Sequence, residues 1–214
     1  ARRGVCDNRD MKSPRSLPLL LLTGIAGALA GIFAARMLAQ KSVALQGGTW
    51  LPEPRALAPL QLTDVNGAPF SDNSLRGHPS LLYLGYVSCP DVCPAALAVL
   101  AEVQRRAQLE GLQLLFITVD PDHDTAALLQ RYLDGFGSRF TGLRPAEGAL
   151  APLLASLAAS AERRGLPGGG RAVDHTATLY LLDLRGRLAA VFTPPLAPAV
   201  LDADLRALAR ASVL

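Results

Sequence analysis

An alternation of short apolar runs with a helical segment constrains the fold of this chain more than any other feature. Leu81–Val87 is a short apolar run that is typical of a buried strand. The helical pattern of residues 95–111 follows and ends at Gly111, and a second apolar run, residues 112–119, ends at Asp120. A strand, helix and strand in this order connect two parallel strands by a right-handed crossover. The sequence therefore predicts a partly parallel sheet covered by helices.

The flanking segments extend this pattern into a complete domain. Asn66-Gly67 between apolar stretches is a hairpin signal, and a second hairpin turns near Arg185-Gly186 within residues 176–192. Helices are predicted over residues 125–137, 145–165 and 197–212. The sum is a three-layer α/β domain over residues 57–214 with a thioredoxin-like arrangement. In such sheets, ligands gather at the carboxyl ends of the parallel strands, where Cys89 and Asp120 fall.

The N-terminal part of the chain has the features of a membrane anchor. Residues 17–38 are apolar and carry no charge until Arg36, which is long enough to span a bilayer as a helix. Five basic residues precede this stretch, so the positive-inside rule predicts residues 1–16 in the cytoplasm and the rest exported. A cleaved signal peptide is the alternative, but the apolar stretch is longer than a usual signal core.

The anchor and its flanking charges predict a single-pass protein of a bacterial inner membrane. Residues 39–56 contain glycines and prolines without periodicity, which predicts a linker between the anchor and a periplasmic domain. Residues 40–214 carry 15 basic and 16 acidic residues, and this balance offers no basic surface for nucleic acid. An oxidising compartment would also allow a nearby pair of cysteines to close into a disulfide.

The pair Cys89 and Cys93, each followed by a proline, is the strongest chemical signal in the domain. Pro94 lacks the N–H of a helix interior and suits the first helical position, so we expect the helix to begin there. Both thiols would then lie at the positive end of the helix, which stabilises thiolates. This placement favours a disulfide exchanger or a soft-metal site over simple packing, without deciding between the two.

His175 is the residue that would distinguish these interpretations. It precedes the predicted strand of residues 176–183 and belongs at the same end of the sheet as the cysteines. Two thiolates and one imidazole suit Cu(I), and the same set with a water would also suit zinc.

Several aspartates near these segments have two interpretations each. Asp120, Asp122 and Asp124 could all lie near the metal. The simpler interpretation is that Asp124 or Thr125 caps the helix that begins there and that the other two form turns. Asp174 either orients His175 as a hydrogen-bond acceptor or forms a turn.

Three motifs in the same order resemble those of a known family. They are "GYVSCPDVCPAAL" at 85–97, "VDPDHDT" at 119–125 and "VDHTATLYLLD" at 173–183. With this spacing, residues 57–208 resemble the SenC/Sco family, the copper-binding, thioredoxin-like proteins of cytochrome c oxidase assembly.

The resemblance implies that Cys89, Cys93 and His175 are copper ligands and that the protein is tethered beside the oxidase. Ser88 departs from the family, which often has histidine there, but the departure removes no ligand. The implied partners are the oxidase subunit that carries the copper centre and another copper chaperone or a thiol reductant.

Two functions remain open from the sequence. The first is a copper chaperone that delivers the metal to the oxidase, and the second is a thiol-disulfide oxidoreductase that reduces the cysteines of the copper centre. The usual redox motif has two residues between its cysteines, whereas this chain has three, and redox exchange makes no demand on His175. A peroxidase is a remote third option, because no arginine or threonine partner precedes Cys89 to activate it.

Overall fold

The computed structural model describes residues 25, 27, 29, 31, 43–106, 111–137, 140–165 and 171–214. The chain divides into two compact units, residues 1–41 and residues 42–214. The predicted cytoplasmic segment lies outside the described residues, as does the predicted anchor of residues 17–38 except at four positions. Within the described part of the chain, no helix has both the length and the apolar character needed to cross a membrane.

The second unit is built from strands and helices that alternate along the chain. The main sheet has the strand order β1-β10-β9-β4-β5-β6-β2-β3, and β7 and β8 form a separate two-stranded hairpin. The elements are β1 (Gly48–Arg55), β2 (Leu62–Asp64), β3 (Pro69–Phe70), α2 (Asp72–Leu75), β4 (Ser80–Gly85), α3 (Val92–Arg106), β5 (Gln113–Thr118), α4 (Ala126–Asp134), β6 (Phe140–Pro145), α5 (Leu150–Ser156), β7 (Ala161–Gly165), β8 (Arg171–His175), β9 (Leu179–Leu182), β10 (Leu188–Phe192) and α6 (Pro198–Arg210).

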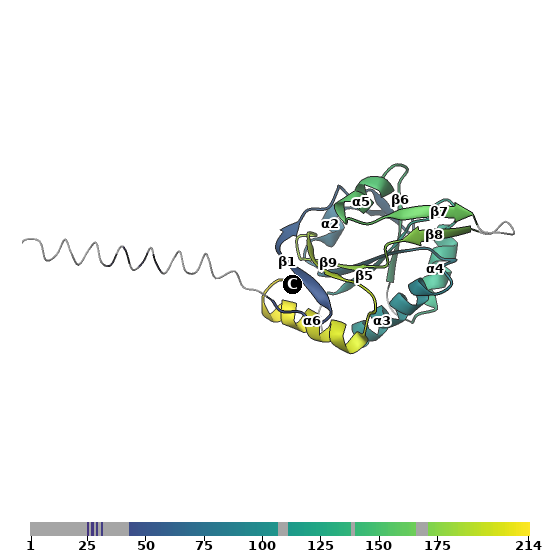
Figure 1. Cartoon of the computed structure of the whole chain (residues 1–214). Helices are drawn as coiled ribbons and strands as arrows, with labels where there is room; N and C mark the ends of the chain where they lie inside the picture. The colour runs from purple at the N-terminus through teal and green to yellow at the C-terminus, as the bar shows by residue number, and fades with distance from the viewer. Residues whose placement is uncertain are drawn as a thin grey trace, which may run out of the picture. The chain divides into compact units, whose positions relative to one another are not determined.

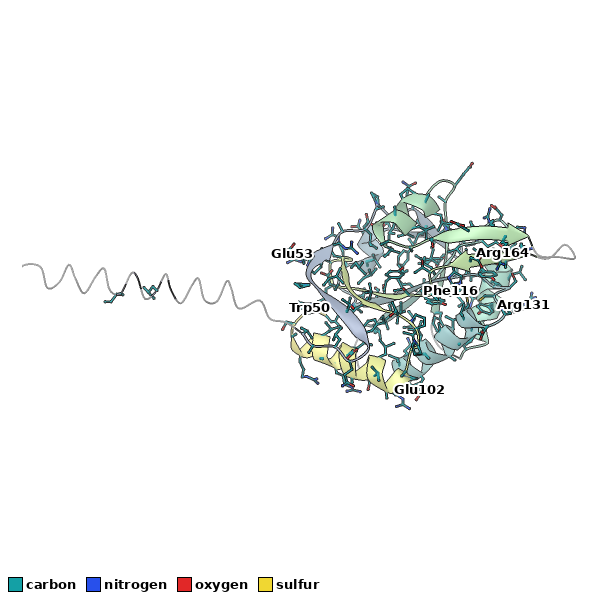
Figure 2. The ribbon with its side chains drawn as sticks, in the orientation of Figure 1. Trp50, Glu53, Glu102, Phe116, Arg131 and Arg164 are labelled. Atoms are coloured by element: carbon teal, nitrogen blue, oxygen red, sulfur yellow. The ribbon has the colours of Figure 1, made fainter. Side chains whose placement is uncertain are left out.

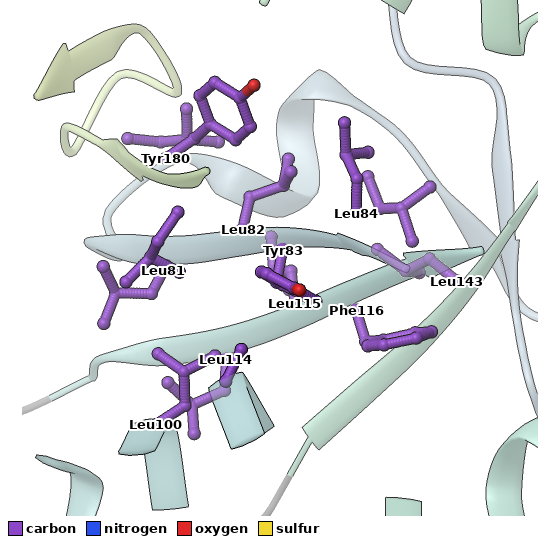
Figure 3. Close-up of a cluster of buried hydrophobic side chains, with 14 of the residues drawn as sticks. Leu81, Leu82, Tyr83, Leu84, Leu100, Leu114, Leu115, Phe116, Leu143 and Tyr180 are labelled. Carbon is purple, nitrogen blue, oxygen red and sulfur yellow. The ribbon is translucent and has the colours of Figure 1, made fainter. Parts of the chain in front are cut away.

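The parallel centre of the sheet agrees with the prediction from the strand-helix-strand pattern. β4 pairs with β5 in parallel, and β5 pairs with β6 in parallel. All six residues of β4 are buried, because a strand at the centre of a sheet has a packed layer on each face. Leucine side chains of β4 and β5 fill the core on both sides of these strands (Figure 3).

Helices α3, α4 and α6 lie together along one side of the sheet, and α2, α5 and the β7–β8 hairpin lie along the other (Figure 1). Phe116 of β5 connects the sheet to the first group, since its ring packs against Tyr132 of α4 with 6.0 Å between centroids. Figure 2 shows Phe116 inside the domain, whereas Arg131 and Arg164 lie at its surface. The predicted three-layer α/β organisation is thereby confirmed.

The segment predicted as a linker, residues 39–56, contributes a strand instead. β1 lies at the edge of the main sheet and pairs antiparallel with β10. Pro52 and Pro54 obscured this strand in the sequence, yet proline is tolerated on an edge strand, where the N–H that it lacks need not pair. Trp50 and Leu51 pack against the core, which explains why the strand is held in place.

The helix predicted over residues 145–165 is the other main difference. Only Leu150–Ser156 is helical, and the C-terminal part of the segment forms β7. Ala158 between them has a φ of 52°, which a continuing helix excludes. The pairing of β7 with β8 supplies backbone hydrogen bonds that local helix propensity, a weak preference, does not outweigh.

Candidate metal centre

The two cysteines lie at the start of α3, just beyond the end of β4. The N–H of Cys89 donates to the carbonyl of Tyr86 at 3.3 Å, which turns the chain toward the helix. The helix begins at Val92, two residues earlier than predicted, so Pro94 is its third residue. Proline is tolerated there because N–H groups of the first turn have no partner within the helix. Cys93 therefore lies inside the first turn, where its N–H donates to the Cys89 sulfur at 3.4 Å.

His175 reaches this pair from the opposite direction, at the end of β8. Its Nε2 lies 3.4 Å from the Cys93 sulfur. The ligand atoms of Cys89, Cys93 and His175 all lie within 4.8 Å of one another. Both cysteines are buried and both are free thiols. The structure thus brings together the three predicted residues from two segments that are more than eighty residues apart in the sequence.

The imidazole of His175 presents a lone pair to the sulfurs. Its Nδ1 lies 3.3 Å from the carbonyl of Thr176, and because a carbonyl can only accept, Nδ1 carries the hydrogen of this contact. Burial lowers the pKa of His175 below its ordinary value, although the Thr176 carbonyl and the Asp174 charge act in the opposite direction. The neutral ring then leaves Nε2 unprotonated, as metal binding requires.

Burial also governs the thiol of Cys93. Its pKa is raised well above the ordinary value, chiefly by loss of contact with water and secondarily by the neighbouring Cys89. The sequence predicted thiolates at the helix N-terminus, whereas the burial of Cys93 raises its pKa and favours the protonated thiol. A metal that binds here must therefore displace the thiol proton.

Two tyrosines that the sequence analysis did not single out pack against the imidazole of His175. The rings of Tyr83 and Tyr86 meet the His175 ring edge to face, with centroids 6.2 Å and 5.8 Å away. The hydroxyl of Tyr83 donates to the carbonyl of Val92 at 3.4 Å, so it also contacts the first turn of α3. The signal in the sequence was their place within and just after β4, directly before the cysteines.

One side of the site opens to solvent. A hollow of about 670 Å³ is lined by Cys89 and His175, whereas Cys93 is fully buried and does not line it. Charged residues of both signs surround the opening: Asp91, Arg164, Arg171 and Asp174. An incoming protein ligand can therefore reach a metal held here without unfolding the domain.

Comparison with known proteins decides the family. The profile of the SCO1/SenC family matches residues 51–210, a range that begins within β1. The chain belongs to the SCO1/SenC family. Proteins of this family bind copper, and copper is present in the solved structure of ScoI from Bradyrhizobium japonicum, which is 37% identical. That structure aligns with a TM-score of 0.65 and covers 71% of this chain and 98% of its own.

More distant similarities agree with this family. The SCO2-like protein of Rickettsia prowazekii is 32% identical over 133 residues, which is 60% of this chain and 65% of the relative. The match thus spans just under two thirds of that relative's length. A thiol:disulfide interchange protein of the thioredoxin family from Chlorobium tepidum shares the fold, with a TM-score of 0.52 at 18% identity over 72% of this chain and 95% of its own. The thioredoxin-like fold predicted from the sequence is confirmed.

The remaining predicted residues of this SCO1/SenC protein lie near the site without contacting its sulfurs. The carboxylate of Asp174 accepts a hydrogen bond from Arg164 at 3.0 Å, and His175 bonds Thr176 instead of Asp174. Thr125 caps α4, since its hydroxyl accepts from the N–H of Leu128. The cap at Thr125 is one that the sequence allowed, whereas Asp174 lies within β8 and pairs with Arg164 instead of orienting His175 or forming a turn.

Asp120 has a more extensive role than either prediction for it. Burial opposes its charge, but hydrogen bonds from His123 and Arg171 and the nearby Arg163 outweigh burial and hold its pKa below the ordinary value. The carboxylate is fully buried at the end of β5 and contacts these side chains instead of the sulfurs.

Proposed function

We propose that this SCO1/SenC protein is a copper chaperone that binds copper through Cys89, Cys93 and His175 and delivers it to the copper centre of cytochrome c oxidase. The observation that carries the proposal is the convergence of these three donor atoms within 4.8 Å of one another. Two buried sulfurs and one neutral imidazole form a soft donor set, which suits copper better than a hard cation.

The geometry of the site also suits transfer of the metal. A set of three donors leaves a coordination position for a ligand from the receiving protein, and the hollow beside Cys89 and His175 gives that ligand a path. Thiolates hold Cu(I) firmly enough to keep it from water. Copper is cargo in this scheme, so a site that is firm but reachable is more useful than a closed one.

The place of action and the partner follow from the rest of the chain and from the family. The apolar stretch of residues 17–38, with five basic residues before it, supports an uncleaved anchor in a bacterial inner membrane. The domain of residues 57–214 would then lie in the periplasm, tethered beside the oxidase subunit that receives copper. A second copper chaperone or a thiol reductant would load the site or keep it reduced.

One observation favours a second function. Cys89 and Cys93 are free and adjacent, and the N–H of Cys93 already donates to the Cys89 sulfur. Such a pair can close into a disulfide, so the alternative is an oxidoreductase that reduces the cysteines of the copper centre. Disulfide exchange, however, gives no reason for an imidazole aimed at Cys93.

Metal competition tests the proposal directly. The full chain, reduced and then exposed to equal amounts of copper and zinc, should retain one copper per chain by elemental analysis. The control is the variant His78→Ala, which removes an exposed histidine away from the site and should retain the same copper. Full occupancy by zinc with copper excluded would contradict the copper assignment.

A further inference from the structure

A buried carboxylate joins the segment that carries His175 to the end of β5. Asp120 is fully buried, its Oδ1 accepts a hydrogen bond from Nδ1 of His123 at 2.9 Å, and Nε of Arg163 forms an ion pair with the same oxygen at 3.2 Å. Its Oδ2 accepts from Nε of Arg171 at 3.1 Å. A carboxylate removed from water in this way is retained only when such partners satisfy it.

Two of these partners belong to the hairpin that ends in His175. Arg163 lies on β7 and Arg171 on β8, so Asp120 contacts both strands. The hairpin forms a two-stranded sheet of its own and is not part of the main sheet. Because an isolated two-stranded hairpin is marginally stable in water, its position depends on contacts such as these.

The same network reaches the segment that carries the cysteines. The N–H of Asp120 donates to Oγ1 of Thr118 at 3.0 Å, and that hydroxyl donates to Oδ2 of Asp124 at 2.5 Å. Oδ2 of Asp124 also accepts from the N–H of Val87, two residues before Cys89, at 3.0 Å. Asp124 and Thr118 are themselves buried. A continuous chain of hydrogen bonds thus runs from the His175 hairpin to the cysteine loop.

We propose that Asp120 is a positioning residue for the metal site, which holds the β7–β8 hairpin so that His175 faces Cys93. This inference rests on the proposed function for its consequence, because the contact between imidazole and sulfur matters only if His175 binds copper. Asp120 does not touch the sulfurs or the imidazole. Its side chain acts through Arg163 and Arg171. The hydrogen bonds from its backbone N–H through Thr118 and Asp124 hold the cysteine loop next to Asp120.

The first test needs no metal. In the full chain without copper, Asp120→Asn should speed amide hydrogen exchange in β7 and β8 by about tenfold or more, because the hairpin loses its charged anchor. The matched control is Asp122→Asn, since Asp122 also pairs with Arg163, at 2.8 Å, but is 67% exposed. Unchanged exchange in Asp120→Asn, or an equal change in the control, would overturn the proposal.

The second test separates positioning from general destabilisation. Loss of a group that orients a metal ligand typically lowers metal affinity by about 10 to 100-fold, and we expect Asp120→Asn to lower Cu(I) affinity by this amount. In a His175→Ala background it should cost nothing further, because no imidazole remains to be positioned. An equal loss in both backgrounds would mean that Asp120 is only structural.

A milder variant covers the case in which Asp120→Asn does not fold. Arg171→Gln removes a half-exposed side chain and leaves Asp120 paired with Arg163 and His123. Arg171→Gln should show the same pattern in both tests with a smaller effect. If it changes neither hydrogen exchange nor copper affinity, the proposal is equally overturned. If the unaltered chain binds no copper, the proposed function fails, while the exchange measurement still decides whether Asp120 holds the hairpin.

Discussion

Replacement of His175 by alanine separates the two candidate functions, and the structure sets the expected size of each effect. The imidazole makes two edge-to-face contacts, with Tyr83 and Tyr86. Each such contact contributes about 0.5 to 1.5 kcal/mol, so the variant should lose about 1 to 3 kcal/mol of stability. Domains are typically stable by about 5 to 15 kcal/mol, and the variant should therefore remain folded.

The effect on copper should be larger than the effect on folding. Changing a residue that merely orients a ligand costs about 10 to 100-fold in metal affinity, so loss of a ligand itself should cost about 100-fold or more. This loss corresponds to at least about 2.8 kcal/mol, at about 1.4 kcal/mol for each factor of ten. Cys89 and Cys93 remain adjacent in the variant, and thiol-disulfide exchange should therefore survive.

Competition with a chromophoric Cu(I) chelator under reducing conditions measures the affinity, and exchange with a small disulfide measures the thiol chemistry. His78→Ala serves as the control, since His78 is exposed and lies away from the sulfurs. Copper affinity that is unchanged in His175→Ala would refute the three-ligand site. In cells, oxidase assembly could proceed normally with His175→Ala but fail with either cysteine variant. That result would mean that the primary function of this chain is thiol-disulfide exchange and not copper delivery.

Four further outcomes are expected. Cys89→Ser and Cys93→Ser should each abolish both copper binding and disulfide formation, as measured by the same two assays. The stabilisation that Asp120 contributes should be complete above its ordinary pKa of 3.8 and should be lost as the pH falls through its lowered pKa. The difference in unfolding free energy between the unaltered chain and Asp120→Asn should therefore shrink below pH 3.8. Leu115→Ala should lower the free energy of unfolding in urea by about 2 to 5 kcal/mol, whereas Leu128→Ala, at a 41% exposed position, should cost far less. A reporter fused to the C-terminus should be active only on the exported side of the membrane, and cytoplasmic activity would reverse the predicted topology.

The site was predictable because its signals are local and chemically specific. Two cysteines with prolines after them indicated a helix start, and the order of strands placed His175 at the same end of the sheet. What the sequence could not show was the burial of Cys93, which raises the pKa of its thiol despite the helix N-terminus. Burial depends on packing against residues far away in the chain, including His175.

The fold was predictable where the periodicity of the sequence and its turn residues agreed. The prediction was wrong where a tertiary contact decided the structure. The hairpin near Arg185-Gly186 formed as predicted, with Gly186 at a φ of 73° that suits glycine. Residues 161–165 became a strand because β8 was available to pair with them. The anchoring of Arg163 and Arg171 by Asp120 was hidden for the same reason, since the predicted helix placed Arg163 in the wrong kind of element.

The prolines of β1 have a consequence for the behaviour of the protein in solution. β1 is the last strand at one end of the main sheet, and an exposed strand edge is a template on which other chains can add strands. Pro52 and Pro54 offer no N–H to such a strand, and the register of β1 shifts between Trp50 and Arg55. The edge is therefore a poor template for added strands, which protects the domain from aggregation through this edge.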